Sequence, residues 1–293
     1  MATLNVALDI VSLPIMRRLA RRNLQSIVSA ALRRVDTTIA WELFNYGLEN
    51  RAWSFLEAGV QPVGATIEAL LSTDAVVDLL EQDFTVGTRR AEQKLRTLRA
   101  PTRPWSTREA AIMANRVAEE TRGSILAVVR RVFARSGSVS EAQRLVRITA
   151  GLDERRAMAV LNLYEKFLSS PGKVLYAGKV RIRVPARATK ELAFKRARAY
   201  ANRLFRQRVR AIVQYERILA ERVGQRAEWR LAILEGRIRV DQVTRTWMTA
   251  EDERVCPVCE PMNGESARLD QPYSNGLDGP PAHMLCRCDE ELA

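Results

Sequence analysis

All four cysteines of this chain and its only histidine lie between Cys256 and Cys288. Cys256 and Cys259 are two residues apart, a spacing that turns both sulfurs to the same side of a tight knuckle. His283 and Cys286 repeat that spacing, and Cys288 follows Cys286 after one intervening residue. Such clustering in a cytosolic chain favours a metal over disulfides. Five candidates are available for four tetrahedral corners, and spacing leaves open which of His283, Cys286 and Cys288 is spare.

Zinc is the metal that this set of ligands favours, because thiolates and an imidazole are soft donors. An iron–sulfur cluster is the alternative, although Cys-x-Cys beside a histidine is not its usual pattern. The surrounding segment is rich in glycine and proline, so metal binding would contribute on the order of 10 kcal/mol to its folding. We expect a structural site, because no histidine pair with a base accompanies it. The acidic residues nearby are interpreted as solvated surface: Glu260, Glu265, Asp289 and Glu290.

The rest of the chain has a helical composition and pattern. Alanine, leucine, arginine and glutamate are plentiful and aromatic residues make up 6% of the chain, which favours helix. Apolar positions recur at helical spacing in residues 4–58 and 65–99. The glycine and proline residues from Gly59 to Gly64 predict a break between these segments, and Gly87 predicts another.

Capping signals mark the starts of the next helices. Ser106 with Glu109, and Ser138 with Glu141, have the capping-box spacing. Helices are therefore expected to begin at these two serines, and the first should run to about Arg135.

The middle of the chain contains two more helices, a hairpin and one long helix. Gly151 to Asp153 should separate a short helix from a longer one that ends near Ser169. Residues 173–184 alternate in polarity and predict a short β-hairpin. A long basic helix is expected over about residues 188–234, with Gly224 as a candidate interruption.

These patterns predict a mainly α protein, with a helical body, a short β-hairpin and a small, loop-rich C-terminal zinc module. Three regions are expected: an N-terminal helical region (1–100), a helical body (101–240) and the zinc module (241–293). No apolar run reaches the roughly 18 residues needed to span a bilayer. The arginines near the start follow the apolar residues instead of preceding them, so we expect synthesis in the cytoplasm and no membrane partner.

The net charge of +13 is unevenly distributed. Residues 173–230 hold 17 basic and 4 acidic residues, whereas residues 250–293 hold 3 basic and 10 acidic ones. Such a local basic excess favours a polyanionic partner. Five arginines of the long helix share one narrow stripe: Arg196, Arg203, Arg206, Arg210 and Arg217. This stripe suits phosphates of double-stranded DNA, without base reading, or an acidic protein; the alternative is an ordinary solvated face.

Arg208 lies among the apolar positions of the same helix. A buried guanidinium needs a carboxylate or carbonyl partner. We expect a structural ion pair with Glu216, two turns along, or with an acid from another helix.

The metal block also carries a resemblance to a known family. The run from Trp247 to Cys259, the turn Asn263-Gly264 and the block from Pro280 to Cys288 resemble the C-terminal signature of tailed-phage minor head proteins. These are head-morphogenesis proteins of the phage Mu F-like family. Met284-Leu285 stand where the family usually has Pro-Asn, which affects no candidate ligand. The similarity extends more weakly over residues 140–290.

This resemblance implies a structural protein of the virion, present in a few copies inside the head near the portal vertex. Its implied partners are the portal protein, the major capsid protein and packaged double-stranded DNA, with a role in assembly or DNA ejection. The alternatives are a zinc-containing nucleic-acid-binding regulator and a phage-borne nuclease or toxin. An acidic metal module disfavours the regulator, and a single histidine disfavours an enzyme. We therefore expect no enzymatic activity and no small-molecule substrate.

Overall fold

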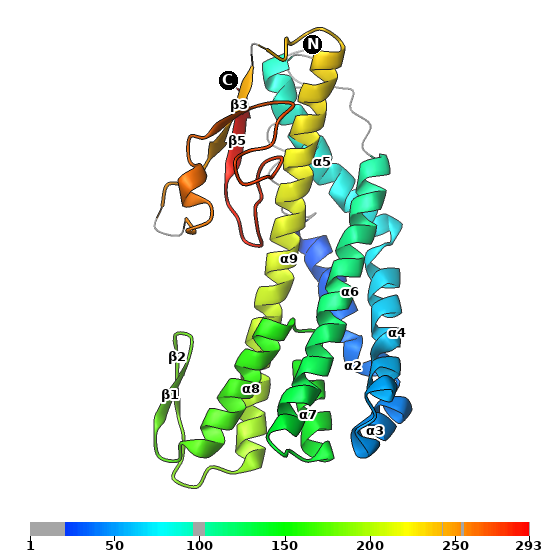
Figure 1. The fold of residues 1–293 in the computed structure, drawn as a ribbon, viewed down its shortest axis with the longest axis vertical. Helices are drawn as coiled ribbons and strands as arrows, with labels where there is room; N and C mark the ends of the chain where they lie inside the picture. Colours follow the sequence, from blue (N-terminus) through cyan, green and yellow to red (C-terminus); the bar gives the residue numbers. More distant parts are fainter. Residues whose placement is uncertain (1–20, 96–102, 242, 253–254, 293) are drawn as a thin grey trace. The chain divides into compact units, whose positions relative to one another are not determined.

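The computed structural model describes residues 21–95, 103–241, 243–252 and 255–292 (Figure 1). The protein is mainly helical, as predicted, with a two-stranded hairpin and a cluster of cysteines and histidine near the C-terminus. The start of the first predicted helix and Pro101 lie outside the described residues. Within these ranges, no helix combines the length and the apolar character that crossing a membrane requires.

Most helices come first along the chain, and the two small antiparallel sheets lie before and after the last long helix. Residues 21–33 are helical. The later helices are α2 (Val35–Thr38), α3 (Trp41–Asn50), α4 (Trp53–Leu71), α5 (Asp74–Leu95), α6 (Arg103–Ala134), α7 (Val139–Thr149), α8 (Glu154–Ser169) and α9 (Lys190–Leu234). The strands and one short 3-10 turn are β1 (Val174–Ala177), β2 (Val180–Arg183), β3 (Thr244–Met248), η1 (Glu260–Met262), β4 (Ser266–Arg268) and β5 (Asp289–Leu292). Strands β1 and β2 form the predicted hairpin, and the second sheet has the order β4-β3-β5.

The chain packs into two compact units, and neither is a single continuous segment. Unit 1 combines Met1–Ser26, Thr73–Ala110 and Arg210–Ala293, whereas unit 2 combines Ile27–Ser72 and Ala111–Val209. This division differs from the three consecutive regions expected from the sequence, because the long helices α6 and α9 each contribute residues to both units.

Of the two capping signals, one predicted its helix start correctly and one did not. The Ser138 hydroxyl accepts a hydrogen bond from the Glu141 backbone N–H at 3.2 Å, and α7 begins directly after it. The Asp153 carboxylate accepts from the Arg156 N–H at 2.9 Å at the start of α8. The predicted start of α6 at Ser106 is wrong, because this helix already begins at Arg103. Its first turn includes a proline, which is tolerated there because the first N–H groups have no intrahelical acceptor.

The predicted break from Gly59 to Gly64 is also wrong, because α4 runs through it without interruption. Gly59 lies against the neighbouring helix α3: a Cβ added to it would stand 2.7 Å from the Cβ of Phe44. Val60, Val63 and the other apolar residues of this helix are buried. Packing of this face outweighs the one backbone hydrogen bond that Pro62 removes.

Gly87 and Gly224 likewise mark a helix contact and not an interruption. Helices α5 and α9 are continuous through them. A Cβ at Gly87 would stand 1.7 Å from the carbonyl oxygen of Glu221, and one at Gly224 would stand 2.1 Å from that of Phe84. The two glycines therefore allow these backbones of unit 1 to approach more closely than any other residue would permit.

We expect Gly224→Ala to destabilise the protein by about 1–3 kcal/mol, the usual effect of overpacking a close contact. This is the opposite of the gain of up to about 1 kcal/mol that alanine gives in an open helix interior. Gly123→Ala in α6 is the matched control, because a Cβ there would meet no atom within 4 Å. Urea denaturation of both variants measures the difference, and equal midpoints would contradict the assignment.

Candidate metal centre

The metal module, which carries β3 to β5 of unit 1, is built around a buried tryptophan. Trp247 lies on the central strand β3 and is fully buried. Its ring packs edge-on against Tyr273, with centroids 5.2 Å apart. The hydrophobic cluster of this module consists of Trp247, Cys259, Met262, Tyr273, Cys286 and Cys288. Three of the four thiols are thus part of the small core, so the ligand positions are fixed by packing.

Two backbone knuckles present the candidate ligands. The Cys256 carbonyl accepts hydrogen bonds from the N–H groups of Cys259 at 3.0 Å and Glu260 at 2.9 Å. In the second knuckle, the His283 carbonyl accepts from the Cys286 N–H, also at 3.0 Å. The repeated two-residue spacing in the sequence therefore corresponds to a repeated turn, which directs two side chains of each knuckle toward one point.

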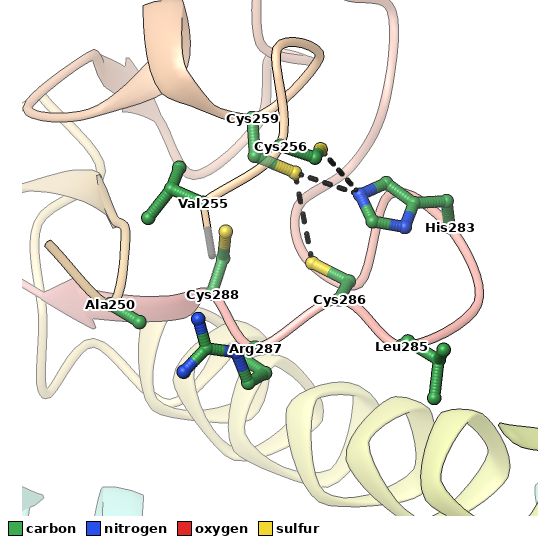
Figure 2. A pocket seen from close by; sticks show the side chains of 9 residues that line it. All are labelled: Ala250, Val255, Cys256, Cys259, His283, Leu285, Cys286, Arg287 and Cys288. Carbon is green, nitrogen blue, oxygen red and sulfur yellow. Dashed lines mark hydrogen bonds between the residues drawn. The ribbon is translucent and has the colours of Figure 1, made fainter. Parts of the chain in front are cut away.

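The five candidate ligands line one small cavity and form two groups that share Cys259 (Figure 2). The Nε2 atom of His283 lies 2.8 Å from the Cys256 sulfur and 3.2 Å from the Cys259 sulfur. The sulfurs of Cys259 and Cys286 are 3.9 Å apart. Cys288 belongs to a second group with Cys259 and Cys286, in which all sulfurs lie within 4.8 Å of one another. Together these side chains line a cavity of about 20 Å³, which has room for about one water-sized sphere.

His283 is oriented for metal binding through Nε2. Its Nδ1 lies 2.8 Å from the carbonyl oxygen of Met284, so Nδ1–H donates to that carbonyl. This hydrogen bond selects the tautomer whose Nε2 lone pair faces the sulfurs, the arrangement usual for metal-bound histidines.

The thiols differ in acidity because each has a different environment. The Cys288 thiol donates to Cys286 and lowers the pKa of Cys286 to about 5, against the opposing effect of burial. The same contact, together with burial, raises the pKa of Cys288. Burial raises the pKa of Cys259 to about 12. Burial opposes it, but hydrogen bonds from Cys259 lower the pKa of Cys256 as well.

The interpretation of Glu290 as solvated surface is wrong, because its side chain is fully buried. One carboxylate oxygen accepts from Arg245 at 2.9 Å and from the Tyr273 hydroxyl at 3.1 Å. The other accepts from Arg226 of α9 at 3.2 Å. Arg245 is 1% exposed and Arg226 is 6% exposed, so one carboxylate compensates two buried guanidinium groups. This cluster fixes β5, the strand that directly follows Cys288, against β3 and α9.

Neighbouring contacts extend this attachment. Gln225 donates to the Glu290 backbone carbonyl at 3.2 Å, and Arg222 pairs with Asp289 at 2.5 Å. One residue could have indicated this buried ionic cluster from the sequence. Arg226 lies on a buried face of α9, as Arg208 does. Its acidic partner lies 64 positions later in the chain, so no local pattern connects the two.

Arg208 is buried, as predicted, and its partner comes from another helix. It donates to Glu120 of α6 at 3.0 Å, and Asp153 lies 3.8 Å away. Further bonds go to Thr121 and to the Gly151 carbonyl, both at 2.9 Å. The pairing with Glu216 is therefore wrong and the alternative acid is correct; Glu216 itself is also fully buried.

The predicted arginine stripe divides into two groups. Arg217 forms a two-point ion pair with Asp83, at 2.9 and 3.0 Å. Arg203 donates to the Ala177 carbonyl of the hairpin at 3.0 Å. The remaining members are exposed and form no ion pair with a residue that the structure describes: Arg196, Arg206 and Arg210. Two of the five arginines therefore have structural partners, which explains them without a ligand.

The geometry yields a cysteine and histidine cluster that could bind a metal ion, held in unit 1 by a buried ionic cluster. Comparisons of the chain with protein-family models, with curated proteins and with solved structures found no match. The choice of metal and of function therefore depends on the residues of this chain alone.

Proposed function

We propose that this chain is a structural protein of a tailed-phage head whose C-terminal module folds around one zinc ion. The observation that carries the proposal is the metal block. Its cysteines, histidine and prolines from Trp247 to Cys288 resemble the signature of phage minor head proteins. Its donor atoms are sulfur and imidazole nitrogen, and this soft set favours zinc over magnesium or calcium.

The four ligands that we propose are Cys256, Cys259, His283 and Cys286. Zinc bonds of about 2.3 Å to sulfur and 2.0 Å to nitrogen imply tetrahedral edges of about 3.8 and 3.5 Å. The Cys259–Cys286 distance of 3.9 Å fits the sulfur–sulfur edge, whereas the sulfur–nitrogen distances of 2.8 and 3.2 Å are shorter than the mixed edge. Metal binding would therefore require Cys286 and the group of Cys256, Cys259 and His283 to adjust around the ion. Cys288 would lie beside the site as the fifth candidate, with its sulfur within 4.8 Å of those of Cys259 and Cys286.

We propose a structural site because the described residues around it offer no group placed to activate a water. The chain has one histidine, and we assign it to the metal. The buried carboxylate of Glu290 is occupied by Arg226 and Arg245, which keep it from acting as a base. Bound zinc would contribute a crosslink between two knuckles and no reactive water.

In the head, the protein would contact the portal protein and the major capsid protein, and its exposed arginines would face packaged double-stranded DNA. Those arginines are Arg196, Arg206 and Arg210 of α9. Such contacts would be to phosphates and independent of base sequence.

Fractionation of purified particles tests this function. We expect mass spectrometry to find the chain in the head fraction, in a few copies per particle, and to find it crosslinked to the portal protein. Procapsids should already contain it, because an assembly role precedes packaging. Recovery of the chain only from the soluble cell fraction, with none in particles, would contradict the proposal.

A further inference from the structure

The β1–β2 hairpin of unit 2 presents a face that combines arginine with an aromatic ring. Tyr176 stands directly opposite Arg181, and Val174 stands opposite Arg183. Residues that are directly opposite in an antiparallel pair point to the same face. Tyr176 is 72% exposed, and both arginines are exposed. This outward face is therefore cationic, with an open tyrosine at its centre.

The cations of the hairpin are uncompensated. Residues 171–189 contain five basic residues and no acidic one: Lys173, Lys179, Arg181, Arg183 and Arg187. All five are exposed, and none forms an ion pair with a residue that the structure describes. Some exposed arginines elsewhere in unit 2 are paired, as in Arg144 with Glu191 and Arg131 with Glu165, whereas Arg196 and Arg206 are not. An ordinary solvated face with alternating charges does not describe this surface.

The hairpin is also held rigidly enough to act as a contact surface. Its inner face buries Ala177 and Ile182. Arg203 of α9 donates to the Ala177 carbonyl at 3.0 Å, directly before the turn. Gly178 begins that turn with φ +61°, the conformation that a type II′ hairpin turn requires at its first position. Figure 1 shows the hairpin as an arm beside α8.

A groove separates this arm from the helices of unit 2. It has a volume of about 410 Å³ and is lined by β1, by Asn162 and Lys166 of α8 and by Tyr200 of α9. Lys166 adds one more exposed cation beside the arm. Cationic or polar side chains therefore lie on both faces of the hairpin.

We propose that the β1–β2 hairpin binds the backbone of duplex DNA, with Arg181 and Arg183 on phosphates and Tyr176 packed against the sugar. Arginine forks make bidentate contacts to phosphate. A two-stranded ribbon fits the major groove of B-form DNA. An acidic protein would be attracted by the same charge, but the exposed ring within the arginine pair favours a ligand with flat, partly apolar sugar and base surfaces. The inference deepens, and rests on, the DNA contact in the proposed function.

The test is binding of the full chain to a short labelled duplex, measured by fluorescence anisotropy from about 50 to 200 mM salt. Arg181→Gln with Arg183→Gln should weaken binding about tenfold and reduce the slope of log affinity against log salt by about two. Tyr176→Ala should weaken binding with no change of slope, because no charge is lost.

The matched control removes the same charge elsewhere. Arg239→Gln with Arg268→Gln takes two exposed arginines that are paired with Asp241 and Asp270. This variant should bind as the wild type does. An equal loss in the control and in the hairpin variant would reduce the effect to net charge and overturn the proposal.

Two further results would distinguish a failure of the hairpin assignment from a failure of the DNA contact on which it rests. If the hairpin variant binds normally while Arg196→Gln with Arg206→Gln weakens binding, DNA contact stands and the hairpin assignment is overturned. If the wild-type chain does not bind DNA at all, the DNA contact of the proposed function fails as well. Polyglutamate that displaces the duplex at equal charge concentration would make an acidic protein the partner and would also overturn the assignment to DNA.

Discussion

Joint replacement Cys256→Ser and Cys259→Ser is expected to abolish zinc binding and to unfold the metal module, while most of the helical content remains. The first knuckle supplies two of the four proposed ligands, and Cys259 is 2% exposed in the module core. Structural zinc contributes on the order of 10 kcal/mol to folding. The remaining core of Trp247, Met262 and Tyr273 is too small to replace this contribution. Helices α3, α4, α7 and α8 belong entirely to unit 2 and should persist.

Metal analysis, limited proteolysis and far-ultraviolet circular dichroism measure this result together. The wild type should hold about one zinc per chain and resist cleavage after β3, whereas the double variant should hold none and be cut there. Cys288→Ser is the matched control: it removes one buried thiol but none of the four proposed ligands, so zinc should be retained. A wild-type protein that contains no metal and still resists proteolysis would refute the zinc module. Loss of zinc in the control would move Cys288 into the ligand set.

Glu290→Ala is expected to reduce the free energy of unfolding by about 3–5 kcal/mol, the usual effect of removing one partner from a buried ion pair. The substitution leaves Arg226 and Arg245 buried without their shared carboxylate. It also removes the acceptor of the Tyr273 hydroxyl. Because the same strand follows Cys288, we expect zinc to be released at a lower concentration of denaturant than in the wild type.

Chemical denaturation followed by tryptophan fluorescence reports on this region, since Trp229 and Trp247 are both buried in unit 1. Asp270→Ala is the control, because it removes a carboxylate of the same module whose ion pair with Arg268 is half-exposed. Exposed pairs contribute at most about 1 kcal/mol. A Glu290 variant no less stable than this control would show that the buried cluster is not needed for folding.

Sequence signals that depend on a few neighbouring residues predicted this structure better than single residues considered alone. Ser138 identified its helix start because a cap depends on residues only three positions apart. The ligand knuckles were predictable for the same reason. Glycine was misleading, because Gly59, Gly87 and Gly224 look like interruptions when one helix is considered alone. Each of them is instead a position where a second helix passes too close for a side chain.

The buried charges could not be predicted from one segment either. The sequence shows that Arg208 occupies an apolar face, but not that its partner is Glu120 of α6. Glu290 lies in an acidic stretch of polar appearance, and only the arrival of Arg226 and Arg245 makes it an interior residue. Partners separated by many positions leave no periodic trace in the chain, so their pairing is decided by tertiary packing.

The discontinuous units have a consequence for how the chain folds during synthesis. All segments of unit 2 have been made once Val209 has left the ribosome, whereas unit 1 still lacks Arg210–Ala293 at that moment. Domains tend to fold as units as they emerge, so we expect unit 2 to form first. It would already contain the first turns of α9. Elongating an existing helix is far easier than nucleating one. The second half of α9 can therefore extend from the folded first half before the zinc ligands have been synthesised.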